Sequence, residues 1–149
     1  MKKTVMLCGP MRGLTEEQIQ NQFDEMREYI DENIMKHFDA IVPEGDHLEI
    51  NFTNNMVKYH APHLADREDD SYRMFCLGTG ISTIMANSDM VMFTPGWQTS
   101  AGCLVEIMTA IMYNKAVYAF ERDAEGKLKE ISTSRLMTII HKGLDLFVQ

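Results

Sequence analysis

Short apolar runs and helical repeats alternate along the first part of the chain. Residues 4–8 form an apolar run that a Gly-Pro pair ends, which is typical of a strand buried on both faces. Over residues 16–36, apolar side chains recur every three or four positions, which predicts an amphipathic helix with an acidic outer face. Thr15 and Gln18 fit a capping box at the start of this helix.

A second strand is predicted at residues 39–42, where Pro43 ends another apolar run. With the preceding strand and helix it forms a βαβ unit, whose right-handed crossover makes the two strands parallel. From about residue 44 to residue 70 the chain is polar and irregular, with several asparagines and three histidines. This composition predicts a long loop, and loops of this length in compact domains are usually functional lids or disordered.

The second half of the chain repeats the alternation. Helical spacing over residues 71–86 predicts a helix, although Gly78 and Gly80 each weaken it by about 1 kcal/mol relative to alanine. Residues 90–93 predict a central strand, and apolar residues at helical spacing predict a helix over about 104–112.

A fourth strand at residues 116–120 completes a second βαβ unit. The charged residues 121–130 predict a surface loop or hairpin, and a final helix runs to about Ile140 with Ser132 or Thr133 as its N-cap.

This order of elements predicts one α/β domain that spans residues 1–149. Strands that alternate with helices favour a doubly wound, flavodoxin-like or Rossmann-like parallel sheet of four to five strands flanked by helices. A length of 149 residues is usual for one domain. In this architecture ligands bind beyond the carboxyl ends of the strands.

The charge balance restricts the expected partners. The chain has 14 Lys and Arg against 22 Asp and Glu, so its formal net charge is −8. This sign disfavours nucleic acids and anionic membranes. An anionic small molecule must instead be held locally, by backbone N–H groups at a helix start and one or two arginines.

The cysteine pattern favours a reducing cytoplasm. The 3 cysteines are scattered without a C-x-x-C pair, so we expect neither a disulfide framework nor a zinc cluster. The apolar start is too short for a signal peptide, and no apolar run reaches the roughly 18 residues of a membrane span. His60 and His63 have the spacing of metal ligands, but nothing nearby completes a site, so we predict no metal and no cofactor.

The loop after the first predicted strand is one candidate for ligand binding. It consists of Gly9, Pro10, Met11, Arg12 and Gly13. Its glycines let the backbone approach a ligand, N–H groups at the following helix start can bind an oxyanion, and the arginine adds a fork of donors. The alternative is a glycine-rich turn with a surface arginine, which βα connections often contain.

The segment after residues 90–93 is the second candidate. Trp97, the only tryptophan, lies at a strand end where a core residue would be wasted, so we expect it to stack on a base or to cover a dimer seam. Ser100 and Gly102 mark the entry to the next helix, and Glu106 lies about one turn inside it. A carboxylate among apolar neighbours is costly to bury unless it faces a cleft. The alternative places Glu106 on the exposed stripe of the helix.

These motifs together support a family resemblance. The chain carries GPMRG after its first strand, then ANSDMVMFTPGWQTSAGCLVE, a small-residue helix and NKAVY. With them it resembles the nucleoside 2-deoxyribosyltransferase-like superfamily, most closely the small phage and bacterial branch related to nucleotide 5′-monophosphate N-glycosidases. The similarity covers both βαβ units but not the polar loop.

The resemblance implies an activity and site residues. Glu106 matches the family's nucleophile, which attacks the anomeric carbon, displaces the base and forms a glycosyl-enzyme that passes to water or to a second base. Ser100 matches a serine that contacts the 5′-phosphate, and residues 9–13 match the loop that wraps the sugar and phosphate. The expected partner is therefore a small-molecule nucleotide. The family also implies a homodimer or higher homo-oligomer with a shared pocket.

One position departs from the family pattern. The family places an aspartate eight residues before the position of Asp89, and this chain has Ile81 there. Asp89 itself is expected to cap a turn. Either a residue near the polar loop substitutes for the acid or the usual reaction does not run; the candidate substitutes are Asp66, Asp69, Asp70 and Tyr72. A non-catalytic protein that binds a nucleotide or an ADP-ribose-like ligand, and a structural phage or host interaction protein, are the alternative functions.

Overall fold

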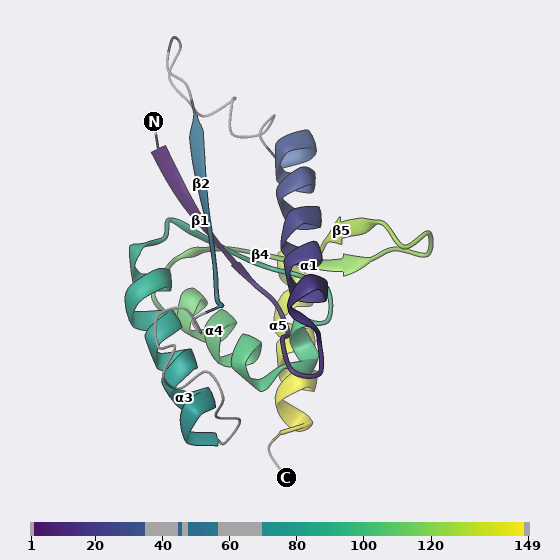
Figure 1. The fold of residues 1–149 in the computed structure, drawn as a ribbon. Helices are drawn as coiled ribbons and strands as arrows, with labels where there is room; N and C mark the ends of the chain where they lie inside the picture. The colour runs from purple at the N-terminus through teal and green to yellow at the C-terminus, as the bar shows by residue number, and fades with distance from the viewer. Residues whose placement is uncertain (1, 35–44, 46–47, 57–69, 148–149) are drawn as a thin grey trace.

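The computed structural model describes residues 2–34, 45, 48–56 and 70–147. Its strands form one sheet in the order β2-β1-β3-β4-β5 (Figure 1). The neighbours of β1 and β3 are all parallel, and only the β4–β5 pair is antiparallel. The strands are β1 (Lys2–Cys8), β2 (Glu49–Asn54), β3 (Met90–Phe93), β4 (Ala116–Arg122) and β5 (Leu128–Glu130). The predicted α/β class is confirmed.

The helices agree with the predicted ones except near their ends. The described helices are α1 (Glu16–Tyr29), α3 (Asp70–Thr79), α4 (Ala101–Met112) and α5 (Thr133–Asp145), with shorter π or 3₁₀ segments η1 (Ile30–Ile34), η3 (Gly80–Ile84), η4 (Met85–Asn87) and η5 (Trp97–Thr99). The capping box of Thr15 and Gln18 is confirmed. Regular α-helix stops at Thr79, immediately before the buried Gly80, in keeping with the predicted weakness there.

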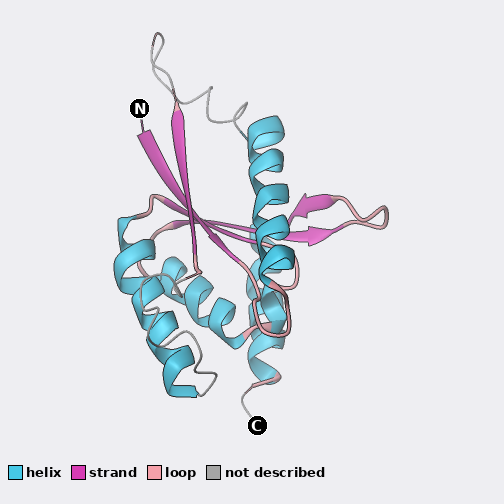
Figure 2. Ribbon diagram, in the orientation of Figure 1, coloured by secondary structure: helices cyan, strands magenta, loops and turns pink. Residues whose placement is uncertain are grey.

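Helices cover both faces of the sheet (Figure 2). Val5 and Leu7 of β1 point to one face, where they pack with Phe23 and Met26 of α1. The other face holds a second buried cluster that draws on β1, β3, β4, α4 and α5; its members include Met6, Cys8, Val91, Phe93, Ala119, Leu104, Ile107, Leu136 and Ile140. Because strand side chains alternate between faces, β1 is buried on both, as its continuous apolar run predicted.

The region predicted as a long loop contains a strand, and that prediction is wrong over residues 49–54. β2 pairs with β1 in parallel, from Lys2 opposite Glu49 to Leu7 opposite Asn54. Only Ile50 and Phe52 of β2 are large apolar residues, and both pack on the α1 side of the sheet. This edge strand therefore lacks the apolar run of a central strand. The strand predicted at residues 39–42 lies outside the described residues.

Asp89 has the structural role that its position predicted. Its carboxylate accepts a hydrogen bond from the Thr4 backbone N–H at 2.9 Å, and its own N–H donates to the Thr4 carbonyl at 2.9 Å. These bonds join the turn before β3 to the first residues of β1. Within the described part of the chain, no helix is both long and apolar enough to cross a membrane.

Candidate functional site

Both candidate segments leave the same end of the sheet. Cys8 and Phe93, the last residues of β1 and β3, lie opposite each other in the parallel register. The chain after β1 leads to α1 on one face, whereas the chain after β3 leads to α4 on the other. This divergence is the switch point at which open α/β sheets bind ligands.

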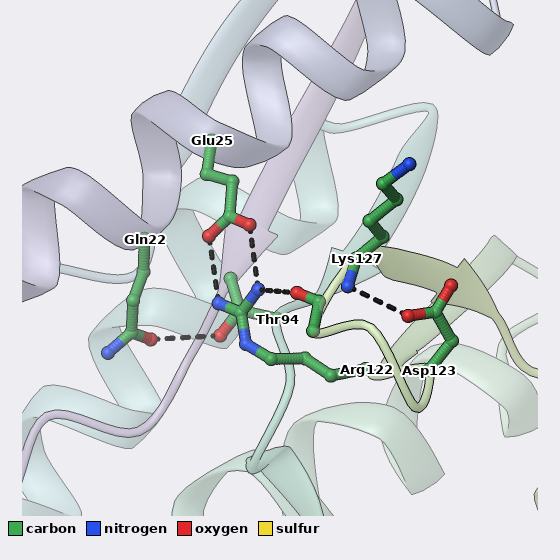
Figure 3. Close-up of polar contacts among 7 residues, drawn as sticks. Gln22, Glu25, Thr94, Arg122, Asp123 and Lys127 are labelled. Carbon is green, nitrogen blue, oxygen red and sulfur yellow. Dashed lines mark hydrogen bonds and ion pairs between the residues drawn. The ribbon is translucent and has the colours of Figure 1, made fainter.

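The two segments are in direct contact. The Thr94 N–H donates to the Cys8 carbonyl at 2.9 Å, and the Thr94 hydroxyl donates to the Gln22 side chain of α1 at 3.1 Å (Figure 3). A Cβ atom on Gly9 would lie 2.5 Å from the Thr94 hydroxyl oxygen. Because Thr94 is fully buried, Gly9 is needed for this close approach of the two segments.

The Glu106 side chain is buried behind these segments, with 4% of its surface exposed. The Asn55 amide nitrogen donates to both carboxyl oxygens of Glu106, at 3.1 Å and 3.4 Å. The Cys8 thiol donates to the second oxygen at 3.4 Å. The end of β1, the residue after β2 and the second turn of α4 therefore meet at this carboxyl group, and the alternative of an exposed Glu106 is wrong.

Burial raises the pKa of Glu106, and the hydrogen bonds from Asn55 and Cys8 offset part of this rise. The resulting pKa is about 7, compared with an ordinary value of 4.5. Burial also raises the pKa of the Cys8 and Cys103 thiols, and the nearby Glu106 carboxylate adds to this rise. Both thiols are therefore neutral near pH 7, and Cys8 acts as a neutral donor. A buried carboxyl group with a pKa near 7 is a common feature of catalytic sites.

Ser100 is the N-cap of α4, as its place at the helix entry predicted. Its hydroxyl oxygen accepts a hydrogen bond from the Cys103 N–H at 3.3 Å. A Cβ atom on Gly102 would lie 3.8 Å from this hydroxyl oxygen, so a small side chain there has ordinary contact distance. Backbone donors at this helix start and the hydroxyl group form an arrangement that can bind an oxyanion.

The loop after β1 is a turn with an exposed arginine at its tip. The Leu14 N–H donates to the Met11 carbonyl at 3.1 Å, and Gly13 has a positive φ of 78°. Pro10 and Met11 are half-buried, while Arg12 is exposed and makes no ion pair with the described residues. The structure places Arg12 on the loop beside the switch point but not against Glu106.

Trp97 is a core residue. The prediction that it would stack on a base or cover a dimer seam, instead of packing in the core, is therefore wrong. Its side chain is fully buried and packs edge-on against Phe93, with ring centroids 6.2 Å apart. Gly96 has a positive φ of 89° just before Trp97, so the chain turns sharply there and the indole joins the cluster under α4 and α5. A ring without exposed surface neither stacks on a ligand nor covers a subunit seam.

Ile81 lies in η3 and packs against the buried cluster on the α4 side of the sheet. Of the residues considered as substitutes for the missing acid, Asp66 and Asp69 lie outside the described residues, as do His60 and His63. Asp70 and Tyr72 lie in the first turn of α3, and the structure describes the backbone of these two residues but not their side chains. Among described residues, no group of three or more His, Cys, Asp or Glu could hold a metal ion.

Asn55 and Cys8 were not identified from the sequence. Asn55 lies in the stretch predicted as a loop, and Cys8 belongs to an apolar strand. No local sequence pattern therefore marked either residue as part of a site. Two surface clefts, of about 370 and 570 Å³, lie elsewhere: one beside α5 and η5, the other between the end of α4 and α5. None of the candidate site residues lines either cleft.

Comparison with known proteins gives no match, whether by family model, by curated sequence or by solved structure. The candidate site is therefore defined by the chain's own geometry. It consists of the buried Glu106 with its two donors, the capped start of α4, and the turn that carries Arg12.

Proposed function

We propose that this chain cleaves the N-glycosidic bond of a small nucleoside 5′-monophosphate, or transfers its deoxyribosyl group, with Glu106 as the nucleophile. The observation that carries the proposal is the buried Glu106 carboxyl group, bonded to Asn55 and Cys8 beside the β1–β3 switch point. The resemblance to the nucleoside 2-deoxyribosyltransferase-like superfamily, in GPMRG and in the motif that contains Ser100 and Glu106, supports it.

The proposed reaction has two displacements. A Glu106 oxygen attacks the anomeric carbon, and the bond to the base breaks with its electron pair going to the base, which takes a proton from solvent. The resulting glycosyl ester is then attacked by water or by a second base, and the Glu106 carboxylate leaves. Splitting one displacement into two steps is the strategy of retaining glycosidases. Because only the ionised carboxylate attacks, the rate should rise with pH through about 7.

Phosphate recognition is proposed at the start of α4. Backbone N–H groups there, the Ser100 hydroxyl group and the exposed Arg12 guanidinium, which makes no ion pair within the described part of the chain, supply donors for a 5′-phosphate. The net charge of −8 gives no general attraction to an anion, so these few local donors must provide it.

The test is base release from a panel of ribo- and deoxyribonucleoside 5′-monophosphates, followed by chromatography. Wild type should release base from at least one member, and Glu106→Gln should lower the rate at least about 10³-fold, because an amide is a poor nucleophile. Glu130→Gln, an exposed position in β5, is the matched control and should keep the wild-type rate. Base release at the wild-type rate by Glu106→Gln would show that Glu106 is not the nucleophile.

Non-catalytic nucleotide binding is the second candidate function. It is favoured by Ile81, a partly buried apolar residue that packs against the core cluster where the family pattern has an acid. Loss of a general acid typically costs a factor of roughly 10² to 10⁴ in rate. Calorimetric binding of an intact nucleoside monophosphate or of ADP-ribose, without base release, would favour this function over the first.

A homo-oligomer in the cytoplasm is also proposed. Large apolar side chains are exposed on α3 and α4 and just beyond α4, which lie on the same side of the sheet; they are Met74, Phe75, Val105, Met112 and Tyr113. Exposed apolar residues on neighbouring elements are typical of subunit interfaces. All three cysteines are free, which supports a reducing compartment.

A further inference from the structure

The position of Asn55 is fixed by the backbone around it. Its N–H donates to the Leu7 carbonyl at 3.1 Å, so it continues the pairing of β2 with β1 by one residue. The Asn54 side chain then accepts the Met56 N–H at 3.0 Å and forms a turn. The Asn55 side chain therefore starts from an anchored backbone at the carboxyl end of β2.

Among the described residues, Glu106 is the side chain that orients the Asn55 amide. The amide nitrogen donates to both carboxyl oxygens, whereas the amide oxygen is buried and has no hydrogen-bond partner within the described part of the chain. Leaving a buried acceptor unsatisfied opposes folding. Most buried polar atoms in proteins have a hydrogen-bond partner, so the placement of this amide favours its contact with Glu106 over the pairing of its own oxygen.

We propose that Asn55 is a positioning residue for Glu106: its amide nitrogen donates to both carboxyl oxygens, which orients the carboxylate and favours its ionised form for attack. This inference rests on the proposed function, in which Glu106 is the nucleophile. Asn55 acts through Glu106 from the position directly after β2, whereas the nucleophile lies on α4.

Of the groups that face Glu106, Asn55 contributes most to stabilising its ionised form. The Cys8 thiol of β1 donates a second, weaker bond, and Cys103 of α4 lies close enough to interact with the carboxylate. Both thiols stay neutral because burial raises their pKa. No cationic group among the described residues contributes to the pKa of Glu106, so removing the amide leaves only a thiol donor.

The experiment measures the Glu106 pKa and base release in wild type, Asn55→Ala and Asn55→Asp. The carboxyl carbon of Glu106 is titrated by ¹³C NMR and assigned by its loss in Glu106→Gln. Asn55→Ala should raise the pKa of Glu106 by about one unit or more, because a donor to the charged form is lost. Base release should then fall about 10-fold at pH 6 and less at pH 9. Asn55→Asp should raise the pKa further, because it adds a like charge.

Asn51→Ala is the matched control, because Asn51 is an exposed residue of the same strand. It should leave both the pKa and the pH profile at their wild-type values. The inference is overturned if the Glu106 pKa is unchanged in a folded Asn55→Ala variant, even where base release depends on Glu106. If the alanine variant does not fold, the isosteric Asn55→Asp variant decides in the same way. Absence of base release by wild type overturns the proposed function instead, and the titration still decides whether Asn55 supports the ionised Glu106.

Discussion

Among the residues that the structure describes, neutral donors and no opposite charge contact the buried Glu106 carboxyl group. An amide and a thiol stabilise its ionised form only partly, so burial dominates and the pKa lies near 7. An arginine in the place of Asn55 would hold the group ionised at every physiological pH and would also compete for its oxygens. Neutral donors leave the carboxylate more nucleophilic once it is ionised.

The raised pKa of Glu106 predicts a pH dependence of stability. A carboxyl group whose pKa rises from 4.5 to about 7 on folding stabilises the fold fully below pH 4.5, and this contribution is lost as pH rises through 7. Relative to Glu106→Gln, wild type should therefore lose about 3 kcal/mol of unfolding free energy between pH 4 and pH 8. Urea unfolding of both proteins at several pH values measures this difference.

The comparison cancels the contributions of other titrating groups, because both proteins share them. Glu130→Gln should show no such difference from wild type, since the Glu130 side chain is exposed. A constant difference between wild type and Glu106→Gln across this pH range would contradict a raised pKa.

The helices differ in how their first turns are capped. Thr15 and Gln18 exchange bonds of 2.9 Å and 3.2 Å between side chains and backbone at the start of α1. Ser132 is the N-cap of α5, but its side chain makes no capping bond and lies 3.2 Å from the Ser134 hydroxyl group. The same type of N-cap residue therefore has different surroundings in the two helices.

This difference predicts unequal costs for removing the two hydroxyl groups. Thr15→Ala should lower the free energy of unfolding by about 1 kcal/mol, whereas Ser132→Ala should lower it by only a few tenths. Thermal and urea unfolding of the two variants beside wild type check this. Equal losses would mean that the capping box adds nothing beyond the preference for a polar N-cap.

The β4–β5 hairpin is fastened to α1 by a surface ion pair. Arg122 of β4 donates to both Glu25 oxygens, at 2.7 Å and 2.8 Å, and also to the Gly126 carbonyl in the hairpin turn (Figure 3). The Arg122 guanidinium lowers the pKa of Glu25. Both side chains are about two-fifths exposed, so the pair is worth at most about 1 kcal/mol. It fixes the direction of the hairpin more than it stabilises the domain.

The whole chain combines an acidic surface with exposed apolar side chains on one side of the sheet. Met112 and Tyr113 at the end of α4 are 75% and 77% exposed, and Met74 of α3 is 73% exposed. A net charge of −8 opposes nonspecific association, so association through these residues must be local.

Self-association through α4 is expected to be visible in the molar mass. Light scattering or sedimentation should report at least a dimer for wild type, and Met112→Glu should shift it toward the 17.1 kDa monomer, because a charge would have to be buried. Met137→Glu on α5, also an exposed methionine, is the control and should leave the mass unchanged. A wild-type protein that is monomeric at high concentration would contradict the homo-oligomer.

Local patterns determined most of the elements, because periodicity and capping act within a few residues. The apolar runs of β1 and β3, the spacing in α1 and α4 and the capping box all lie in contiguous sequence, and the α/β class follows from their order. Glu106 and Ser100 were identified from a contiguous motif for the same reason. The −8 charge was likewise fixed by composition.

Contacts between distant residues decided the rest. β2 is an edge strand whose identity depends on pairing with β1, and its polar residues resemble a loop when taken alone. Trp97 is buried because helix α5 and the sheet enclose it. These contacts join residues that are distant in sequence, so no local pattern predicts them. Asn55 and Cys8 lie 51 and 98 positions from Glu106, and only the parallel register of β2, β1 and β3 brings them to one carboxyl group. The nucleophile candidate was thus visible in the sequence, while its burial and its donors came from folding.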